Sequence, residues 1–490
     1  MLPSNLRFQE PFGGSPHGLQ LLSLETNFYG DLQMTSISRT WAGFALGLSF
    51  DKLTPDAVDA AKRFLYDSLG CALGANRHTD VDIAREVVLT LGGNAHATLI
   101  GDGRRVPVTS AAFLNGLMVR AMDYNDIYWK ADPTHPSDLI SGPLAAAEWK
   151  ERSGAELLTA IVLAYELEMR MAEFGLPGIR ERGWHHATLT QYVSPIAAGM
   201  LMGLDEEQLV NAVGISGSHG CTLGSVTAGK LTMMKNTVEP FAVADGVMAA
   251  LLALGGYSGP EPVLEGKEGL FHCLGPDWRA EILTEGLGES FRIPQCGMKA
   301  FPTEALTHTP ISAFLTLIRE HGIAHEQIAE VRIGTIARAA DILSDPSKYR
   351  PDSKETADHS LPFCIAAAAV DGAVTPACFK QERLHDERIF SVIDKIKVYP
   401  DDEFEQAFPA KQCTRVEITT VGGGKFEKRM DYPKGDAREP MTEQDLDTKF
   451  RSLASACMTD ARMDEIKHAV FSLDTAPDLK ELMLLLTADK

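Results

Sequence analysis

The sequence predicts a mainly α-helical protein that carries an inserted α+β domain. Apolar residues repeat at helical spacing over most of the first 290 residues and again after residue 442. Between these regions, several short segments alternate with the period of two that is typical of strands. A chain of 490 residues is too long for one typical domain, so we expect two or three compact units.

Four segments follow from these patterns. Residues 1–34 contain Pro, Gly and Ser without periodicity, and we expect either a tail without fixed structure or a start assigned too early. They lack the charged start and apolar centre of a signal peptide. Residues 35–294 form the first part of a helical domain, 295–433 a smaller α+β domain, and 434–490 the C-terminal part of the helical domain. The return to helix after residue 433 suggests that the smaller domain is an insertion.

Helix signals define the elements of the helical domain. Thr54 and Pro55 are an N-cap and a first helical residue, and Gly74 closes the helix. Thr109 is predicted to cap another helix, which delivers Asp123 near its C-terminal end, where a carboxylate opposes the helix dipole by about 0.3–1 kcal/mol. Further helices are expected over 141–150, 154–174, 191–204, 206–213, 241–254, 443–456, 464–472 and 478–487.

Strand signals define the α+β domain. Residues 331–333 and 395–399 alternate with period two, and residues 415–421 and 425–432 flank three glycines as a hairpin. Helices are predicted among them over 303–321 and 360–371. This mixture is typical of an α+β domain.

Composition excludes several classes of function. The net charge is −21, which argues against binding to nucleic acid or to an anionic membrane surface. Apolar runs such as 157–169 and 247–254 are shorter than the ~18–20 residues that span a bilayer, so no membrane span is expected. Eight scattered cysteines show no C-x-x-C spacing, which indicates reduced thiols in a cytoplasmic protein.

The most unusual stretch is residues 121–138. It combines Asp123, Asp126 and His135 with two tyrosines, a tryptophan, a lysine and two further aspartates. Buried charges need partners, and solvated loops rarely contain so many aromatics. The stretch therefore fits either a pocket wall or an ordinary ordered loop with capping aspartates.

Three further segments carry imidazoles, and one of them also carries Lys299. His185 and His186 precede a helix start; as adjacent residues they are expected to point in different directions, so they could supply one pocket imidazole or be capping or surface residues. Residues 299–308 place Lys299 and His308 at the start of the α+β domain. Asp358 and His359 form a third cluster, which could equally cap the helix that follows.

Other motifs argue against metals and nucleotides. Residues 224–230 nearly match the phosphate-binding loop, but Leu231 stands where that motif needs Ser or Thr, and no strand precedes it. A glycine loop there would still suit the wall of a carboxylate site that includes Lys235. His321 and His325 have the spacing of a helical metal pair, but Gly322 disfavours the helix. The sequence contains neither G-x-S-x-G nor G-x-G-x-x-G.

In their order and spacing, these segments resemble the MmgE/PrpD family, which includes 2-methylcitrate dehydratases, cis-aconitate decarboxylases and an iminodisuccinate epimerase. The resemblance covers residues 36–487 and rests on six segments: Asp123-Tyr124-Asn125-Asp126, His135-Pro136-Ser137-Asp138, Gly183-Trp184-His185, Lys235 with the helix around 242–246, Phe301-Pro302-Thr303-Glu304 with His308, and Asp358-His359-Ser360. It implies a large all-helical domain with an inserted α/β lid, an active site in the cleft between them, and a homodimer. It also implies no metal and no organic cofactor.

The resemblance implies a pocket of Asp123, His135, His185, Lys235 and His308, to which the local sequence adds Asp126 and Lys299. We expect the lysines and Asp126 to bind a small anionic carboxylate, and Asp123 and the histidines to transfer protons. The first candidate reaction is dehydration of 2-methylcitrate or a related 3-hydroxy acid of propionate metabolism. Leu139, where the dehydratase branch usually has asparagine, and the histidine shared with the decarboxylase branch keep cis-aconitate decarboxylation as the alternative. Epimerisation of a dicarboxylate and non-catalytic carboxylate binding also remain open.

Overall fold

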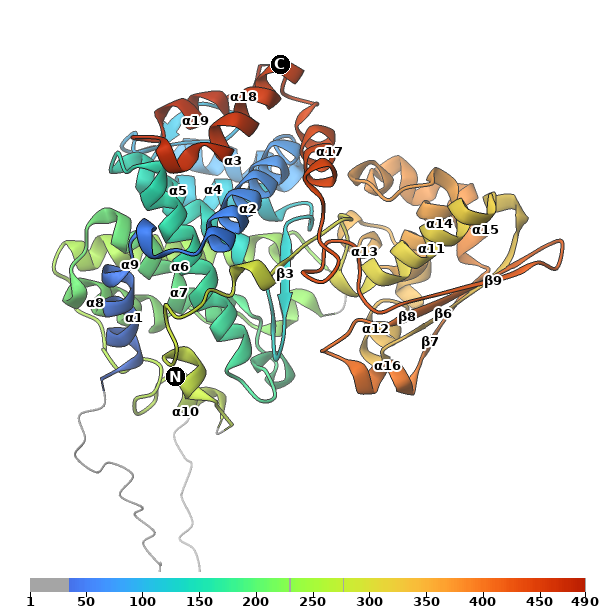
Figure 1. The fold of residues 1–490 in the computed structure, drawn as a ribbon, viewed down its shortest axis with the longest axis horizontal. Helices are drawn as coiled ribbons and strands as arrows, with labels where there is room; N and C mark the ends of the chain where they lie inside the picture. Colours follow the sequence, from blue (N-terminus) through green and yellow to red (C-terminus); the bar gives the residue numbers. More distant parts are fainter. Residues whose placement is uncertain (1–34, 229–230, 276, 490) are drawn as a thin grey trace, which may run out of the picture. The chain divides into compact units, whose positions relative to one another are not determined.

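The computed structural model describes residues 35–228, 231–275 and 277–489, and these are mainly helical with small sheets (Figure 1). The mostly helical fold class predicted from the sequence is therefore confirmed. The predicted tail over residues 1–34 lies outside the described residues. The boundaries of the predicted domains and the closing of a lid over the site remain predictions.

One apolar core is built from both ends of the described chain. In Figure 1 the C-terminal helices, drawn in red, lie beside α2. Tyr66 of α2 stacks on Phe450 of α17 with ring centroids 4.1 Å apart, and burying each such side chain contributes about 1.5–3 kcal/mol. The helices are α1 (Ile37–Gly47), α2 (Pro55–Gly74), α3 (Thr79–Leu91), α4 (Val108–Arg120), α5 (Ser141–Trp149), α6 (Gly154–Glu173), α7 (Ala187–Met202), α8 (Glu206–Gly217), α9 (Met234–Leu254), α10 (Leu270–Leu274), α17 (Glu443–Ala454), α18 (Asp460–Phe471) and α19 (Lys480–Leu485).

A second apolar core lies between residues 306 and 418. It lies against a sheet of order β7-β6-β8-β9, in which β6 and β7 are parallel and the other pairs are antiparallel. The predicted strands and the hairpin are confirmed as β6 (Ile328–Thr335), β7 (Ile396–Pro400), β8 (Thr414–Thr420) and β9 (Lys425–Met430). The helices here are α11 (His308–His321), α12 (Ala337–Ile342), α13 (Lys354–Ala357), α14 (Leu361–Asp371), α15 (Glu387–Ile393) and α16 (Asp402–Ala407).

A small sheet that the sequence analysis missed lies in the unusual stretch. β3 (Asp126–Trp129) pairs with β4 (Pro133–Thr134) on one side and with β5 (Gly297–Met298) on the other. β3 and β5 lie about 170 residues apart in the chain, and β4 and β5 have only two residues each, so a period of two could not show. The pairing places Lys299, which follows β5, beside the turn that carries Asp123.

Five predicted helix starts are wrong. Three were expected at residues 191, 303 and 464, whereas α7, α11 and α18 begin at Ala187, His308 and Asp460. The other two concern the helix before Asp123 and α9. The helix that carries Asp123 at its end starts at Val108 after Pro107, so Thr109 lies inside it rather than capping it. Helix α9 starts at Met234 instead of residue 241 and continues through Pro240. A proline removes one intrahelical hydrogen bond, but packing against α4, α7 and α8 supports the helix around it.

Helix α9 is the one helix among the described residues that is long and apolar enough to cross a membrane by length and composition. The sequence analysis missed it because the segment was divided at Pro240. Its packing against α4, α7 and α8 is typical of a core helix. At Gly246, a Cβ atom would lie 1.8 Å from Oγ of Ser194 on α7, so the two helices approach as closely as glycine allows.

Candidate active site

Six of the side chains that line a buried cavity of about 70 Å³ are Asp123, His135, His185, Lys235, Lys299 and His359. We call this space the central cavity. Its walls come from the turn after α4, the start of the helical turn at residue 136, the start of α7, the start of α9, the end of β5 and the end of α13. Five of the seven site residues predicted from the sequence therefore line one space.

Asp123 carries the negative charge at the centre of this group. Its Oδ1 atom lies 3.0 Å from Nζ of Lys235 and 3.0 Å from Nζ of Lys299, and it also pairs with the guanidinium of Arg120. Burial alone would raise the pKa of Asp123, but these three cations hold it well below its usual range. Asp123 also adopts a left-handed backbone conformation with φ of 51°, which costs about 1 kcal/mol or more in a non-glycine residue. Such strain is common at functional sites.

The two lysines bring ammonium groups to the cavity wall. Burial, reinforced by the charge of Arg120, lowers the pKa of Lys235 from 10.5 to about 8. Burial also lowers the pKa of Lys299, whose Nζ donates a hydrogen bond to the main-chain oxygen of Asp123 at 3.2 Å. Arg120 also lies near Glu239 and Asp138, whereas both lysines pair with Asp123.

The two predicted histidines of the cavity present different ring nitrogens. Nδ1 of His135 lies 2.6 Å from the main-chain oxygen of Asp126, which can only accept, so Nδ1 carries the hydrogen and Nε2 is left as an acceptor. Nδ1 of His185 instead accepts the main-chain N–H of Ala187 at 3.2 Å, which leaves Nε2–H as a donor. Burial is the main cause that lowers the pKa of both rings well below the usual range, so both are neutral near pH 7.

Arg120 connects the cavity to a buried ionic network. Its Nε atom lies 3.6 Å from Oδ2 of Asp138 and 3.8 Å from Oε2 of Glu239 on α9. Oε1 of the same glutamate lies 2.8 Å from Nε2 of His186. Burial raises the pKa of Asp138 well above its usual range, whereas Arg120 and the two imidazoles hold the pKa of Glu239 well below it against burial.

The expectation that His185 and His186 point in different directions is wrong. Their ring centroids lie 4.0 Å apart, and each has a ring nitrogen within 4 Å of Glu239. These three residues are the one group among the described residues with the spacing of a metal site. Arg120 occupies the other side of the glutamate, however, and a divalent cation there would face a guanidinium in a dry site. The donor set therefore fits the observed ion pair better than a metal.

Asp126 does not line the central cavity, so the structure does not support its predicted contact with substrate. Its buried carboxylate accepts hydrogen bonds from Oγ of Ser137 at 2.6 Å and from the Ser137 main-chain N–H at 3.0 Å. Burial raises its pKa to about 6. The polar signal in the sequence instead reflects a residue that orders the following loop and, through its main-chain oxygen, orients His135.

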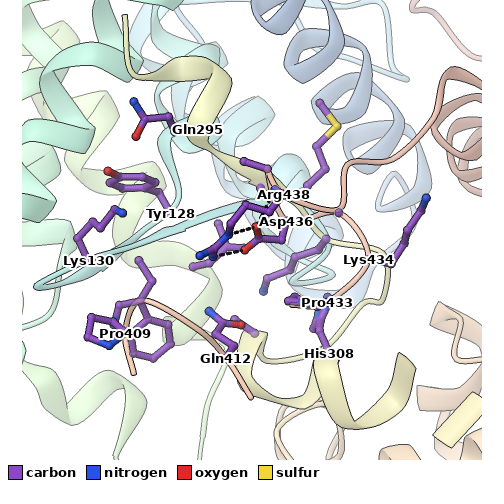
Figure 2. Close-up of a pocket in the computed structure, with 18 residues that line it drawn as sticks. Tyr128, Lys130, Gln295, His308, Pro409, Gln412, Pro433, Lys434, Asp436 and Arg438 are labelled. Atoms are coloured by element: carbon purple, nitrogen blue, oxygen red, sulfur yellow. Dashed lines mark hydrogen bonds and ion pairs between the residues drawn. The ribbon is translucent and has the colours of Figure 1, made fainter. Parts of the chain in front are cut away.

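His308 lines a neighbouring cavity of about 210 Å³, which Figure 2 shows and which we call the second cavity. It lies there with Lys130, Gln412 and Lys434, and Nε2 of His308 lies 3.2 Å from the main-chain oxygen of Thr303. Burial lowers its pKa to about 3. His308 does not line the central cavity, and among the other predicted site residues it shares the second cavity with Lys299. The two cavities share a wall in which Ile127, Trp129, Lys299 and Ala305 line both sides.

Sequence reasoning missed three residues of this site, namely Arg120, Glu239 and His359. Glu239 follows Lys235 by four residues, which is the spacing of neighbours on one helix face, but the helix was predicted to start after both. Arg120 looked like an ordinary basic residue at a helix end. His359 was noted in an Asp–His cluster and in one of the six segments of the family resemblance, but it was not predicted as a site residue.

Comparison with known proteins defines the class. The MmgE/PrpD N-terminal domain matches residues 39–282 and the MmgE/PrpD C-terminal domain matches residues 301–473. The chain therefore belongs to the MmgE/PrpD family, as the sequence analysis predicted.

Individual relatives within the family have two different activities. The cis-aconitate decarboxylase of Aspergillus terreus is 25% identical over 471 residues, covering 90% of this chain and 94% of its own. The cis-aconitate decarboxylase of Homo sapiens is 26% identical over 467 residues, covering 93% and 95%. The 2-methylcitrate dehydratase of Escherichia coli is 27% identical over 416 residues, covering 78% and 82%. These relatives are lyases, and identities near 25% leave the particular reaction open.

Proposed function

We propose that this protein is a lyase that acts on a small di- or tricarboxylate by acid–base catalysis. The observation that carries the proposal is the central cavity, in which Lys235 and Lys299 flank Asp123 while His135 and His185 present opposite hydrogen-bonding functions. The lysines would bind substrate carboxylates. Neutral imidazoles with one acceptor nitrogen and one donor N–H suit acceptance of a proton or hydrogen bond from the substrate and donation of a hydrogen bond to a leaving group.

Two reactions fit this arrangement. In dehydration of a 3-hydroxy acid, a base takes the proton beside a carboxylate while an acid protonates the departing hydroxyl. The Asp-Tyr-Asn-Asp and His-Pro-Ser-Asp segments favour this reaction, with 2-methylcitrate as the first candidate substrate. Decarboxylation of cis-aconitate is the second candidate, favoured because the decarboxylase relatives align over 89–93% of the chain and the dehydratases over 78–80%.

One experiment separates the candidates. The purified protein is incubated with 2-methylcitrate, citrate and cis-aconitate, and the release of CO₂ and the ultraviolet absorbance of unsaturated acids are recorded. Absorbance without CO₂ from a hydroxy acid identifies a dehydratase, and CO₂ from cis-aconitate identifies a decarboxylase. Binding of these acids without CO₂ or a change in absorbance would contradict both lyase reactions and favour a non-catalytic binder.

We also propose that the protein is a homodimer in the cytoplasm and that α9 contributes to its interface. Four large apolar side chains recur on one face of α9 with 39–47% of their surface exposed: Met234, Phe241, Met248 and Leu252. Since the other face of the helix packs in the core, a second copy would cover this one. Light scattering should give twice the chain mass for the wild type and the chain mass for Met248→Glu. A monomeric wild type would refute the proposal.

A further inference from the structure

Asp358 and His359 form a hydrogen-bonded pair on the wall of the central cavity. Nδ1 of His359 lies 2.5 Å from Oδ1 of Asp358, and Oδ2 of the aspartate lies 2.9 Å from Nζ of Lys354. The same Nζ donates a hydrogen bond to the main-chain oxygen of Ala121 at 2.8 Å, two residues before Asp123. The pair is thus fixed to the turn that carries the central carboxylate.

Capping does not explain this pair. The helix that follows, α14, is capped by Ser360, whose Oγ accepts the main-chain N–H of Phe363 at 3.0 Å. The main-chain oxygen of Asp358 accepts a hydrogen bond from Glu304, but its carboxylate is not involved in that contact. The buried carboxylate of Asp358 therefore bonds to the imidazole of His359, which lines the cavity and has 13% of its side chain exposed.

We propose that His359 is a catalytic acid–base residue and that Asp358 is its positioning residue. The carboxylate can only accept, so Nδ1 of His359 carries the hydrogen and Nε2 is free for a substrate proton. An aspartate in this position fixes the tautomer and the orientation of the ring and stabilises the imidazolium that forms. The inference rests on the proposed lyase function. It assigns removal of the proton from carbon to His359 and leaves Nε2 of His135 to accept a hydrogen bond from the substrate.

The proton transfer can be written for dehydration. Nε2 of His359 takes the proton from the carbon beside a carboxylate, and the C–H electron pair becomes the new C=C bond. The imidazolium of His359 then gives this proton to the hydroxyl of the neighbouring carbon, which leaves as water with the C–O electron pair, while Nε2–H of His185 donates a hydrogen bond to that hydroxyl. Both rings end neutral.

The charges that face His359 suit a base. Burial and the cation of Lys235 on α9 lower its pKa, while Asp358 on α13 and Asp123 after α4 raise it. The balance lies below the ordinary value, so the ring is neutral near pH 7. Because Asp358 raises the pKa, replacing it with asparagine should lower the pKa of His359 further.

The test compares the wild type with His359→Gln and Asp358→Asn in steady-state kinetics across pH. We expect His359→Gln to lower kcat at least about 100-fold with KM changed by less than about threefold. Asp358→Asn should lower kcat by about 10-fold or more and move the acidic limb of the pH profile to lower pH. A purely structural role would lower the melting temperature without moving that limb.

A matched control exists outside the cavity. His78 and Asp80 form a pair with the same 2.5 Å distance between Nδ1 and Oδ1, and His78 lines a different cavity. His78→Gln should keep kcat within about twofold. Binding of tricarballylate, measured by calorimetry, reports whether each variant is folded.

The outcomes separate this inference from the proposed function. A wild type that processes a tricarboxylate, together with an equally active His359→Gln, would overturn the role of His359 alone. A wild type that is inert toward every acid in the panel would overturn the lyase function and this inference with it. If His359→Gln does not bind tricarballylate, the test is the acidic limb of the pH profile of Asp358→Asn. A limb at the wild-type pH would overturn the proposed role of His359.

Discussion

Lys235 should impose an alkaline limit on catalysis that an ordinary lysine would not. Its pKa is lowered from 10.5 to about 8, mainly by burial, which corresponds to about 3 kcal/mol in favour of the neutral form. Only the ammonium form attracts a substrate carboxylate. We therefore expect kcat/KM to be level up to about pH 8 and then to fall about tenfold for each pH unit.

Replacement of Lys235 tests the assignment of this limb. In Lys235→Arg the guanidinium stays charged at every accessible pH, so the limb near pH 8 should disappear, although the altered geometry should reduce the absolute rate. Lys130→Arg is the control, because Lys130 is exposed and lines the second cavity. The reasoning is refuted if Lys235→Arg retains the limb at the wild-type pH.

The same lowered pKa has a consequence for stability. Between about pH 8 and 10.5 the unfolded chain binds the Lys235 proton more tightly than the folded chain does. Stability conferred by this position should therefore rise with pH across that window. The free energy of unfolding in urea is measured for the wild type and for Lys235→Met across this pH range. The wild-type value minus the variant value should rise with pH, and a difference that falls with pH would contradict the prediction.

Three further predictions address the rest of the site. Arg120→Met should lower the free energy of unfolding, measured in urea, by about 3–5 kcal/mol, because it leaves buried carboxylates without their cation. The control Arg104→Met, at the surface, should lower it by less than about 1 kcal/mol. Similar losses in both variants would contradict the network. His135→Ala should lower kcat at least about 100-fold with an unchanged circular dichroism spectrum, and unchanged turnover would remove His135 from catalysis. Dialysis against a chelator should leave kcat/KM unchanged, and recovery of lost activity by an added metal would reverse the interpretation of His185, His186 and Glu239.

The sequence predicted the helices and the larger sheet well because their signals are local. Apolar spacing, Pro55 at a first helical position and the three glycines of the hairpin each act within a few residues. The predicted start of α9 was wrong because a proline usually marks a helix boundary. In the structure, packing against α4, α7 and α8 lets the helix continue through Pro240. The β3–β4–β5 sheet was missed because β4 and β5 have only two residues each and β5 comes from a segment distant in the sequence.

The site was predicted in part for a similar reason. Residue types and their order indicated which segments carry chemistry, and five of seven predicted side chains line the central cavity. The direction in which a side chain points cannot be read from the neighbouring residues. Asp126 and His308 were therefore predicted to line the same pocket as the others. In the structure Asp126 bonds to Ser137 and His308 lines the second cavity. Arg120 and Glu239 were missed because an ion pair has no sequence signature when its partners are over 100 residues apart.

The contact between Gly246 and Ser194 has a consequence for how substitutions in this chain should be interpreted. Gly246 lies seven residues along the same helix from Glu239, about 10 Å away, yet it sets how that helix is rotated and how deeply it is seated. Any larger residue there would push the helix outward and carry an ammonium and a carboxylate with it. Loss of activity could therefore arise at a position that touches no ligand and bears no functional group.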